Sequence, residues 1–417
     1  MSGPYRVLLV TDAYAPMIGG AERAVASLAA ELVDRGHAIS VATAWQDGLP
    51  ARDTRDGVEV HRLRDLTSRV PWVSADPYKH VPPPFADPEA VVRFRRLVRR
   101  FRPDLIHSYG WLTYSCAARI ARGRVPLVLS VHDYGNFCAL RTMLHMDREP
   151  CSGPAARKCL SCSAHHYGAV KGAVAVAGVL GGRRRLARAS AGAQCNSQHT
   201  HEMAWRHLLA GRAGFAQRSD ADAVLPPLGD RSPSGMPDRA ILDRLPESYI
   251  LFVGALRRMK GLPELLEAYG RLPSAPALVL VGTREIDTPE RFPAGVTVID
   301  AMPHATVMAA WDRALFGVFP SLSAEPFGLA LHEAMSRGRA VIGTTPGGHA
   351  EMIVDSQTGL LVPHGDVAAL AAAMQRLIED PALRERLGQA ARQRAELLAG
   401  EHSVDRLEAL YEAAISG

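Results

Sequence analysis

The chain opens with two short apolar runs separated by a segment of helix length. Residues 5–11 and 39–43 are runs of strand length, and residues 21–35 between them have the length and mixed polarity of a helix. Two parallel strands need a long connection, usually a helix, to bring the chain back to the same end of the sheet. The order strand, helix, strand therefore predicts a doubly wound α/β fold, with a parallel sheet between layers of helices.

The same pattern begins again in the second half of the chain. Residues 249–253 form an apolar run, and a helix is predicted over residues 262–272. Between the halves, residues 230–246 have the proline-, serine- and glycine-containing composition of a linker. A chain of 417 residues is also too long for one ordinary core. We therefore predict two domains, residues 1–229 and residues 247–399.

The composition is that of a folded globular protein. Hydrophobic residues make up 47% and charged residues 22% of the chain, which excludes a disordered or fibrous protein. The sequence contains no uninterrupted apolar run of about 18 residues, the length that spans a membrane. The first residues lead into a predicted strand without a signal peptide, so we expect a cytoplasmic protein.

Arginines cluster in two places in the first half, although the net charge is only +5. One interpretation is that they attract an anionic acceptor or make peripheral contact with a membrane. The spacing of the first cluster favours another, the solvated face of an amphipathic helix. Aromatic residues do not alternate with the basic ones, so we expect no nucleic-acid partner. The two clusters are Arg93, Arg95, Arg96, Arg99, Arg100 and Arg102, and Arg183, Arg184 and Arg185.

Residues 319–335, F-P-S-L-S-A-E-P-F-G-L-A-L-H-E-A-M, carry most of the chemical information. They predict the end of a strand, a turn and the start of a helix, with Glu325 in the turn and Glu333 just inside the helix. The first backbone amides of a helix lack partners and favour a phosphate. The stretch thus predicts a site for a charged, hydroxyl-rich ligand such as a sugar nucleotide; the alternative is an ordinary turn with two surface glutamates. The amides concerned belong to Phe327, Gly328 and Leu329.

Three more candidates lie at the predicted carboxyl ends of strands, where open α/β sheets bind ligands. Gly19 and Gly20 precede the first helix, His132 follows the strand at residues 127–131, and Lys260 precedes the helix at residues 262–272. An imidazole can hydrogen-bond a sugar hydroxyl, and an ammonium can act as a point charge on a diphosphate. Taken singly, each also fits a structural role in an ordinary loop.

Four segments resemble motifs of one enzyme family. They are E-P-F-G-L-A-L-H-E at residues 325–333, G-G-A-E at 19–22, V-H-D-Y at 131–134 and G-A-L-R-R-M-K-G at 254–261. The first resembles the Glu-x7-Glu signature of the retaining glycosyltransferases of family 4, and the resemblance covers nearly the whole chain. It implies the GT-B fold, in which two Rossmann-like domains face a central cleft. It also implies that a helix at about residues 400–417 packs back on the first domain.

The resemblance assigns roles to the charged candidates. It implies that Glu325 contacts the donor sugar and Glu333 the ribose, and that His132 reaches the donor sugar. In the family, an arginine and a lysine together neutralise the leaving diphosphate. Lys260 matches the lysine, but Ala255 stands at the arginine position. Either a neighbouring arginine supplies the second charge, or the donor is held differently; the neighbours are Arg257 and Arg258.

The remaining implied donor contacts lie in two loops. The resemblance places the loop with Gly19 and Gly20 near the donor phosphates and the acceptor, and residues 300–304, with Met302, at the base. The predicted catalytic residues are Glu325, His132 and Lys260. The predicted donor-binding residues are Gly19, Gly20, Arg257, Arg258, Met302, Phe327, Gly328, Leu329 and Glu333.

Four of the six cysteines fall within 25 positions of one another: Cys138, Cys151, Cys159 and Cys162. In a cytoplasmic protein such a cluster favours a metal site over disulfides, and four thiolates would hold a structural zinc. A disulfide pair, free thiols and an iron–sulfur centre are the alternatives. The cluster resembles an insertion found in a subgroup of family 4. Cys116 and Cys195 are predicted to be core residues.

We therefore predict a retaining, metal-independent hexosyltransferase that uses a nucleoside-diphosphate sugar such as a UDP-sugar. Its acceptor is a hydroxyl on a glycan, a lipid-linked glycan or a natural product, and the long loop at residues 71–87 is the candidate for acceptor recognition. Two other functions fit the same residues. One is a nucleotide-sugar epimerase or phosphorylase on the same fold, and the other is a non-catalytic sugar-nucleotide-binding partner subunit.

Overall fold

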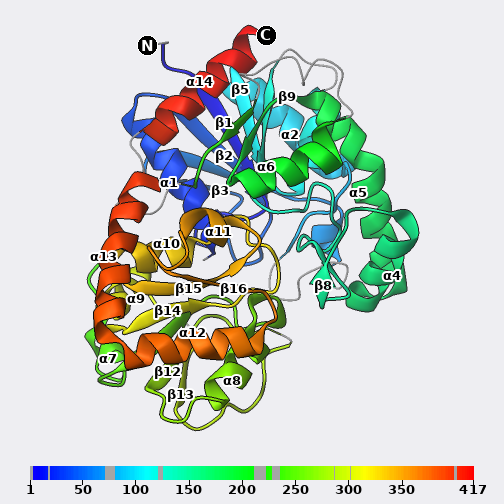
Figure 1. The fold of residues 1–417 in the computed structure, drawn as a ribbon. Helices are drawn as coiled ribbons and strands as arrows, with labels where there is room; N and C mark the ends of the chain where they lie inside the picture. The colour runs from blue at the N-terminus through cyan, green and yellow to red at the C-terminus, as the bar shows by residue number, and fades with distance from the viewer. Residues whose placement is uncertain are drawn as a thin grey trace. The chain divides into compact units, whose positions relative to one another are not determined.

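The computed structural model describes residues 3–16, 19–70, 80–120, 125–210, 222–227, 235–285, 287–300, 302–398 and 402–417. The chain divides into two compact units (Figure 1). The first consists of Met1–Met146, Cys151–Leu228 and Glu401–Gly417, and the second of Asp147–Pro150 and Gly229–Gly400.

The described part of the first unit is built on an eight-stranded sheet with the order β10-β9-β6-β5-β1-β2-β4-β3. Its strands are parallel except for β3, which runs antiparallel to β4. The central strands are buried along almost their whole length, as expected for a parallel sheet covered on both faces. The strands are β1 (Arg6–Thr11), β2 (Ala38–Ala44), β3 (Arg52–Arg55), β4 (Val58–Leu63), β5 (Leu105–Tyr109), β6 (Leu127–Val131), β9 (Ser190–Cys195) and β10 (Asp222–Val224).

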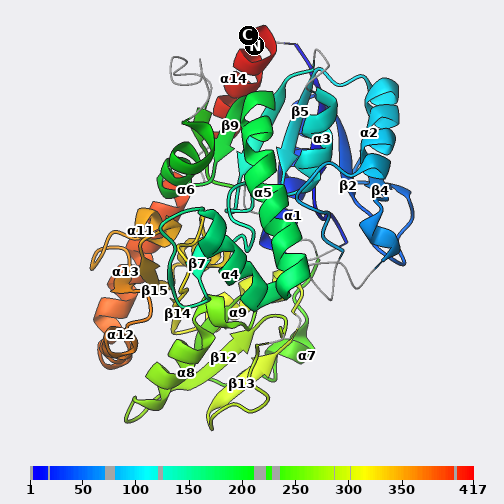
Figure 2. The same ribbon diagram turned by 90° about the vertical axis from the view of Figure 1, so that its right-hand side faces the viewer.

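Helices cover both faces of this sheet. One core includes residues of α2 (Pro88–Phe101), α3 (Leu112–Ile120) and α5 (Ala169–Ala189), which Figure 2 shows on the same side. The opposite core lies under α1 (Gly20–Asp34) and α14 (His402–Ser416). The remaining elements of the first unit are η1 (Thr67–Arg69), β7 (Leu144–His145), α4 (Ala156–Tyr167), α6 (Gln198–Ala204) and η3 (Trp205–Leu209). The short strand β8 (Glu149–Pro150) belongs to the second unit.

The last helix of the chain, α14, belongs to the first unit. The Tyr411 hydroxyl lies 2.7 Å from Nδ1 of His107, and both residues have no exposed surface. On the surface, Arg35 pairs with Asp405 at 2.6 Å and with Glu408 at 3.2 Å. A buried polar contact and an ion-pair cluster therefore hold α14 against β5 and α1.

The described part of the second unit has a six-stranded parallel sheet with the order β13-β12-β11-β14-β15-β16. One core lies between the sheet and α8 and α12, and the other between the sheet and α9, α10 and α13. The strands are β11 (Tyr249–Val253), β12 (Ala277–Val281), β13 (Val296–Ile299), β14 (Phe316–Phe319), β15 (Ala340–Thr345) and β16 (Leu360–Pro363). The helices are α7 (Arg239–Leu242), η5 (Arg258–Lys260), α8 (Leu262–Gly270), α9 (His304–Arg313), α10 (Leu329–Ser336), α11 (Gly348–Met352), α12 (Val367–Glu379) and α13 (Pro381–Leu398).

Each sheet changes the direction of its strand order once. In the first unit the change falls between β1 and β5, and in the second between β11 and β14. At such a point the loops that leave the two neighbouring strands diverge and leave a crevice for a ligand. The predicted doubly wound fold is confirmed in both units, and none of the helices in the described ranges is both long and apolar enough to cross a bilayer.

Two local features depart from regular structure or from prediction. The α-helix α6 ends at Ala204 and continues as the π-helical η3, where the amide of Ala210 donates to the carbonyl of Trp205. Within the predicted linker, Asp238 caps α7, so residues 239–242 are helical. Residues 71–79 of the predicted acceptor loop lie outside the described residues.

Gly261 occupies the turn that leads into α8. We expect its replacement to destabilise the protein. Its φ of 75° is unfavourable for other residues, and a Cβ atom there would overlap the carbonyl oxygen of Pro320. We expect Gly261→Ala to lower the free energy of unfolding by about 1–3 kcal/mol in urea titration. Gly270→Ala is the control, because Gly270 ends α8 with open space around its Cβ position. An equal loss in both variants would contradict the role of the close contact.

Candidate active site

The second unit joins two predicted site residues at the point where its strand order changes. Lys260 follows β11, and Glu325 follows the neighbouring strand β14. Nζ of Lys260 lies 2.6 Å from Oε1 of Glu325, and the Ser321 hydroxyl donates to the same oxygen at 2.6 Å. Residues 65 positions apart in sequence therefore form one charged cluster.

Backbone contacts hold the loops of this cluster together. The amide of Leu322 donates to the carbonyl of Met259 at 3.0 Å, which joins the loops after β14 and β11. The amide of Gly348 donates to the carbonyl of Glu325 at 2.6 Å, which adds the loop after β15. These bonds restrict the position of the Glu325 carboxylate, because the main chain of Glu325 is hydrogen-bonded to a neighbouring loop.

The charge state of Glu325 follows from this environment. The residue is only 7% exposed. Burial raises the pKa of its carboxyl, but the Lys260 ammonium, the His349 imidazole and the Ser321 hydroxyl outweigh burial and lower the pKa to about 2. Burial also lowers the pKa of His349 to about 4, so this imidazole is neutral near pH 7. At neutral pH we therefore attribute the ionised state of Glu325 to Lys260 and Ser321.

The start of α10 lies next to His349. Gly328 precedes the helix with a φ of 105°, and a Cβ atom there would lie 2.6 Å from Nε2 of His349. Within the described residues no side chain caps this helix end. Its first amides can therefore bind an anion, with the helix dipole adding to the attraction. Of the predicted residues here, Phe327 packs in the core and Leu329 is half-buried at its edge.

The second glutamate of the signature has a partner that the sequence did not reveal. Oε1 of Glu333 lies 3.0 Å from Nε2 of His304, the first residue of α9. Met302, predicted at the base, is two positions away and packs against the core. His304, whose loop the resemblance places at the base, thus contacts the glutamate predicted to contact the ribose.

The arginines of the loop after β11 differ in their surroundings. The backbone amide of Arg258 donates to Asp287 at 2.8 Å. Nε of Arg257 is buried and has no hydrogen-bond partner in the described part of the chain. A buried donor without a partner is costly, so Arg257 is the better candidate for contact with a bound anion.

In the first unit, Gly19 and Gly20 lie at the start of α1. Gly19 precedes the helix, and a Cβ atom there would overlap Oε2 of Glu22. The carboxylate of Glu22 therefore folds back over the helix start, where the dipole favours a negative charge. This close approach gives a local reason for glycine at position 19.

His132 lies beside a partly buried ion cluster at the ends of β1 and β6. Its Nε2 is 3.8 Å from Oδ2 of Asp133, and its Nδ1 has no hydrogen-bond partner among the described residues. Arg141 pairs with Asp133 at 2.6 Å and with Asp12 at 3.0 Å. The Arg141 guanidinium also lies 5.4 Å from the centre of the Trp111 ring. Burial raises the pKa of Asp133, but Arg141 outweighs it and the pKa is lowered overall.

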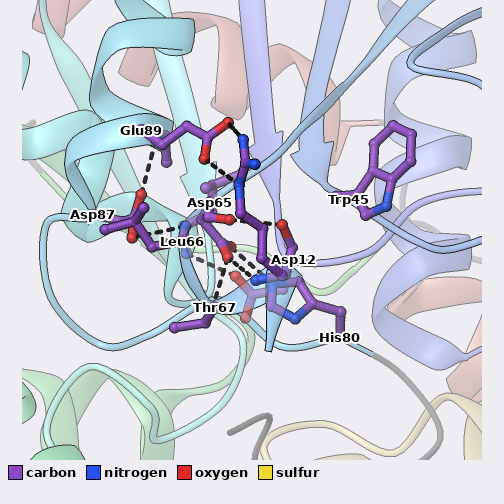
Figure 3. Close-up of polar contacts among 12 residues, drawn as sticks. Asp12, Trp45, Asp65, Leu66, Thr67, His80, Asp87 and Glu89 are labelled. Carbon is purple, nitrogen blue, oxygen red and sulfur yellow. Dashed lines mark hydrogen bonds and ion pairs between the residues drawn. The ribbon is translucent and has the colours of Figure 1, made fainter. Parts of the chain in front are cut away.

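A second polar network follows β4 (Figure 3). The buried Asp65 carboxylate accepts from the Thr67 hydroxyl at 2.7 Å and contacts Nε2 of His80 at 2.8 Å. Asp87, also buried, accepts from the amides of Leu66 and Ala90. These bonds fix the residues on both sides of positions 71–79 and thus the two ends of the predicted acceptor loop.

The cysteine-rich segment shows no zinc site. All six cysteines are free, and the described residues contain no group of three or more His, Cys, Asp or Glu side chains that could hold a metal. Amides at Met146 and Ala155 each donate to a thiol instead, those of Cys162 and Cys159. The predicted zinc is therefore not supported. Cys116 and Cys195 are fully buried core residues, as predicted.

Comparisons with known families identify the class of protein. The glycosyl transferase 4-like domain matches residues 19–189, and glycosyl transferases group 1 matches residues 238–394. With two doubly wound sheets, these matches define a glycosyltransferase of the GT-B type. More particularly, the two matches and the relatives described next support a family 4-like GT-B glycosyltransferase.

Individual relatives agree with this class. A glycogen synthase of Mycobacterium tuberculosis (strain ATCC 25618 / H37Rv) is 27% identical, over 93% of this chain and 90% of its own length. D-inositol 3-phosphate glycosyltransferase 1 of Catenulispora acidiphila is 27% identical, over 75% of this chain and 73% of its own length. Two solved structures share the fold. Sucrose-phosphate synthase from Thermosynechococcus elongatus has a TM-score of 0.71 at 22% identity and covers 96% of each chain. Anabaena HepE in complex with UDP and glucose has a TM-score of 0.67 at 17% identity and covers 99% of this chain and 100% of its own.

Proposed function

We propose that the protein transfers a sugar from a nucleoside-diphosphate sugar to an acceptor hydroxyl, with retention at the anomeric carbon and without a catalytic metal. The observation that carries this proposal is the Lys260–Glu325 ion pair at the change of strand order, beside the uncapped start of α10. In this proposal the second unit binds the donor, and the first unit binds the acceptor and supplies His132.

The donor diphosphate binds Lys260 and the first amides of α10. Lys260 already shares its charge with Glu325, so a diphosphate needs a further positive group. The buried Nε of Arg257 supplies it, in place of the arginine that Ala255 replaces. Glu333 accepts hydrogen bonds from the ribose hydroxyls, and His304 orients its carboxylate at 3.0 Å. Glu325 and His132 orient the donor sugar.

Transfer proceeds on the face from which the diphosphate leaves. The bond from the anomeric carbon to the phosphate oxygen breaks while the acceptor oxygen forms a new bond to the same carbon. The acceptor proton passes to a phosphate oxygen, so no protein base is needed. Negative charge grows on the leaving diphosphate as the bond breaks. Lys260 and the α10 amides stabilise this charge, and they are already in position before the reaction begins. Glu325, ionised at neutral pH, lies beside them.

A donor panel tests the proposal. Nucleoside-diphosphate sugars, UDP-glucose first, are screened by thermal shift and by release of nucleoside diphosphate with EDTA present. A donor at about 100 times its Kd should stabilise the protein by about 2.7 kcal/mol. The glycoside formed should keep the anomeric configuration of the donor in NMR spectra. Glu325→Gln should lose turnover, whereas Glu267→Gln, an exposed pair with Arg271, should not.

Three outcomes contradict transfer. An epimerised nucleotide sugar in the absence of acceptor identifies an epimerase. A sugar phosphate formed only after addition of inorganic phosphate identifies a phosphorylase. A thermal shift without turnover, for every donor and a broad range of hydroxyl acceptors, identifies a binding subunit.

A further inference from the structure

Residues 151–201 contain no aspartate or glutamate. The same stretch carries seven basic residues, so its formal charge is +7, more than the +5 of the whole chain. It includes α4 and α5, which pack side by side in both views of the fold (Figures 1 and 2). The basic residues are Arg157, Lys158, Lys171, Arg183, Arg184, Arg185 and Arg188.

One side of α5 faces away from α4 and is apolar over its first turns. Gly172 marks the side in contact with α4, because a Cβ atom there would lie 2.6 Å from the backbone of Ser163. A helix turns by about 100° per residue, which puts Val170, Val174 and Ala177 on the opposite side. Val170 is 79% exposed and Val174 is 48% exposed. On α4, Leu160 is 43% exposed.

The outward side of α5 becomes cationic further along the helix. By the same spacing, Arg184, Arg185 and Arg188 continue the stripe that Val170 and Val174 begin, and all three arginines are exposed. Arg157 on α4 is exposed as well. The helix pair thus combines exposed aliphatic side chains with a strong positive charge that its own residues do not offset.

The arginine-rich α2 differs from this helix pair. Its Glu89 pairs with Arg93 at 2.7 Å and with Arg69 at 3.0 Å, and its Arg100 pairs with Glu59 at 3.2 Å. Acidic partners therefore offset part of the charge of α2. Its exposed aliphatic residue, Val92, makes α2 a useful reference surface.

We propose that α4 and α5 dock the protein on an anionic phospholipid bilayer. Leu160, Val170 and Val174 enter the boundary between the headgroups and the acyl chains, and the basic residues contact lipid phosphates. Apolar area and attraction to anionic lipids act together in such binding. A water-soluble polyanion would use the charges alone and leave the aliphatic stripe in water. This docking is independent of the proposed sugar transfer.

Co-sedimentation of the full chain with vesicles tests the docking. We expect binding to phosphatidylcholine vesicles that contain phosphatidylglycerol, and at least tenfold weaker binding to phosphatidylcholine alone. Val170→Asp/Val174→Asp should weaken binding to the anionic vesicles at least tenfold. Val92→Asp on α2 is the matched control and should bind like the unaltered protein. Circular dichroism and thermal melting show whether each variant is folded.

A second pair of variants tests the charges without altering apolar residues. Arg184→Gln/Arg185→Gln should weaken binding to the anionic vesicles, whereas Arg95→Gln/Arg96→Gln on α2 should weaken it less. Failure of the unaltered protein to bind either vesicle overturns the docking. So does equal binding by all folded variants. Binding that heparin abolishes and Val170→Asp/Val174→Asp does not affect also overturns it, and indicates a soluble polyanion as the partner.

Discussion

Replacing Lys260 with alanine is expected to lower kcat by about 10²–10³-fold, the usual effect of removing one group that stabilises transition-state charge. It should also lower the free energy of unfolding by about 3–5 kcal/mol, because it leaves a buried carboxylate without its counterion. Lys260 Nζ lies 2.6 Å from a Glu325 side chain that is 9% exposed. Urea titration and initial-rate kinetics with the donor found in the panel measure the two effects.

The stability loss in Lys260→Ala should depend on pH. In the native protein the pKa of Glu325 falls from 4.5 to about 2, so its ionisation contributes stability that is complete above about pH 4.5 and is lost as the pH falls toward 2. Without Lys260, burial favours the protonated carboxyl. The difference in unfolding free energy between the native protein and the variant should therefore be largest at about pH 7 and shrink at about pH 3.

The double variant Lys260→Met/Glu325→Gln separates stability from catalysis. It removes both charges, so most of the stability lost in Lys260→Ala should return, because replacing a buried ion pair with neutral groups is often tolerated. Activity should remain low, since neither group can act on the donor. Recovery of turnover together with stability would show that the pair acts only through folding. A pH-independent stability loss in Lys260→Ala would contradict the low pKa of Glu325.

Arg141→Met is expected to cause the second large loss of stability, about 3–5 kcal/mol. Arg141 is the counterion of both Asp12 and Asp133, at 3.0 Å and 2.6 Å, and Trp111 lies against its guanidinium. Its removal leaves two carboxylates close together without a positive charge. Arg141→Lys should restore only part of the stability, because an ammonium cannot reproduce the planar contacts of the guanidinium. Denaturant unfolding measures each variant.

Arg100→Met is the matched control for Arg141→Met. Arg100 pairs with Glu59 at 3.2 Å, but its side chain is 56% exposed. An exposed ion pair contributes only about 0.2–1 kcal/mol. The Arg141 side chain is only 25% exposed, so similar losses for Arg100→Met and Arg141→Met would contradict its role as a partly buried counterion. Asp133 is next to His132. If His132 orients the donor, Arg141→Lys should therefore lower activity by more than the loss of folded protein explains.

The fold and one half of the candidate site followed from local sequence patterns. Apolar runs of strand length alternate with helices, and this order dictates a parallel sheet in each unit. Lys260 and Glu325 could be proposed as partners because each stands just after a predicted strand. Motif residues at the carboxyl ends of strands meet wherever those strands are neighbours, as β11 and β14 are.

The missed residues depend on contacts between distant parts of the chain. Arg141 lies 129 positions from Asp12, and His304 lies 29 positions from Glu333. The positions of Asp12 and Asp133 directly after strands were a usable signal, but no spacing rule connects either to Arg141. The cysteines were close in sequence, and this closeness predicted a common ligand that the structure does not support. The thiols of Cys159 and Cys162 accept from separate backbone amides.

The position of α14 has a consequence for how the protein is made. Tyr411, Leu407 and Leu410 fill the core on one face of the first unit, and they are synthesised after the second unit. A ribosome that has finished the first 229 residues has still not supplied this layer. We therefore expect the amino-terminal half to keep part of its apolar surface uncovered until α14 has left the exit tunnel, which reverses the usual order of folding during translation.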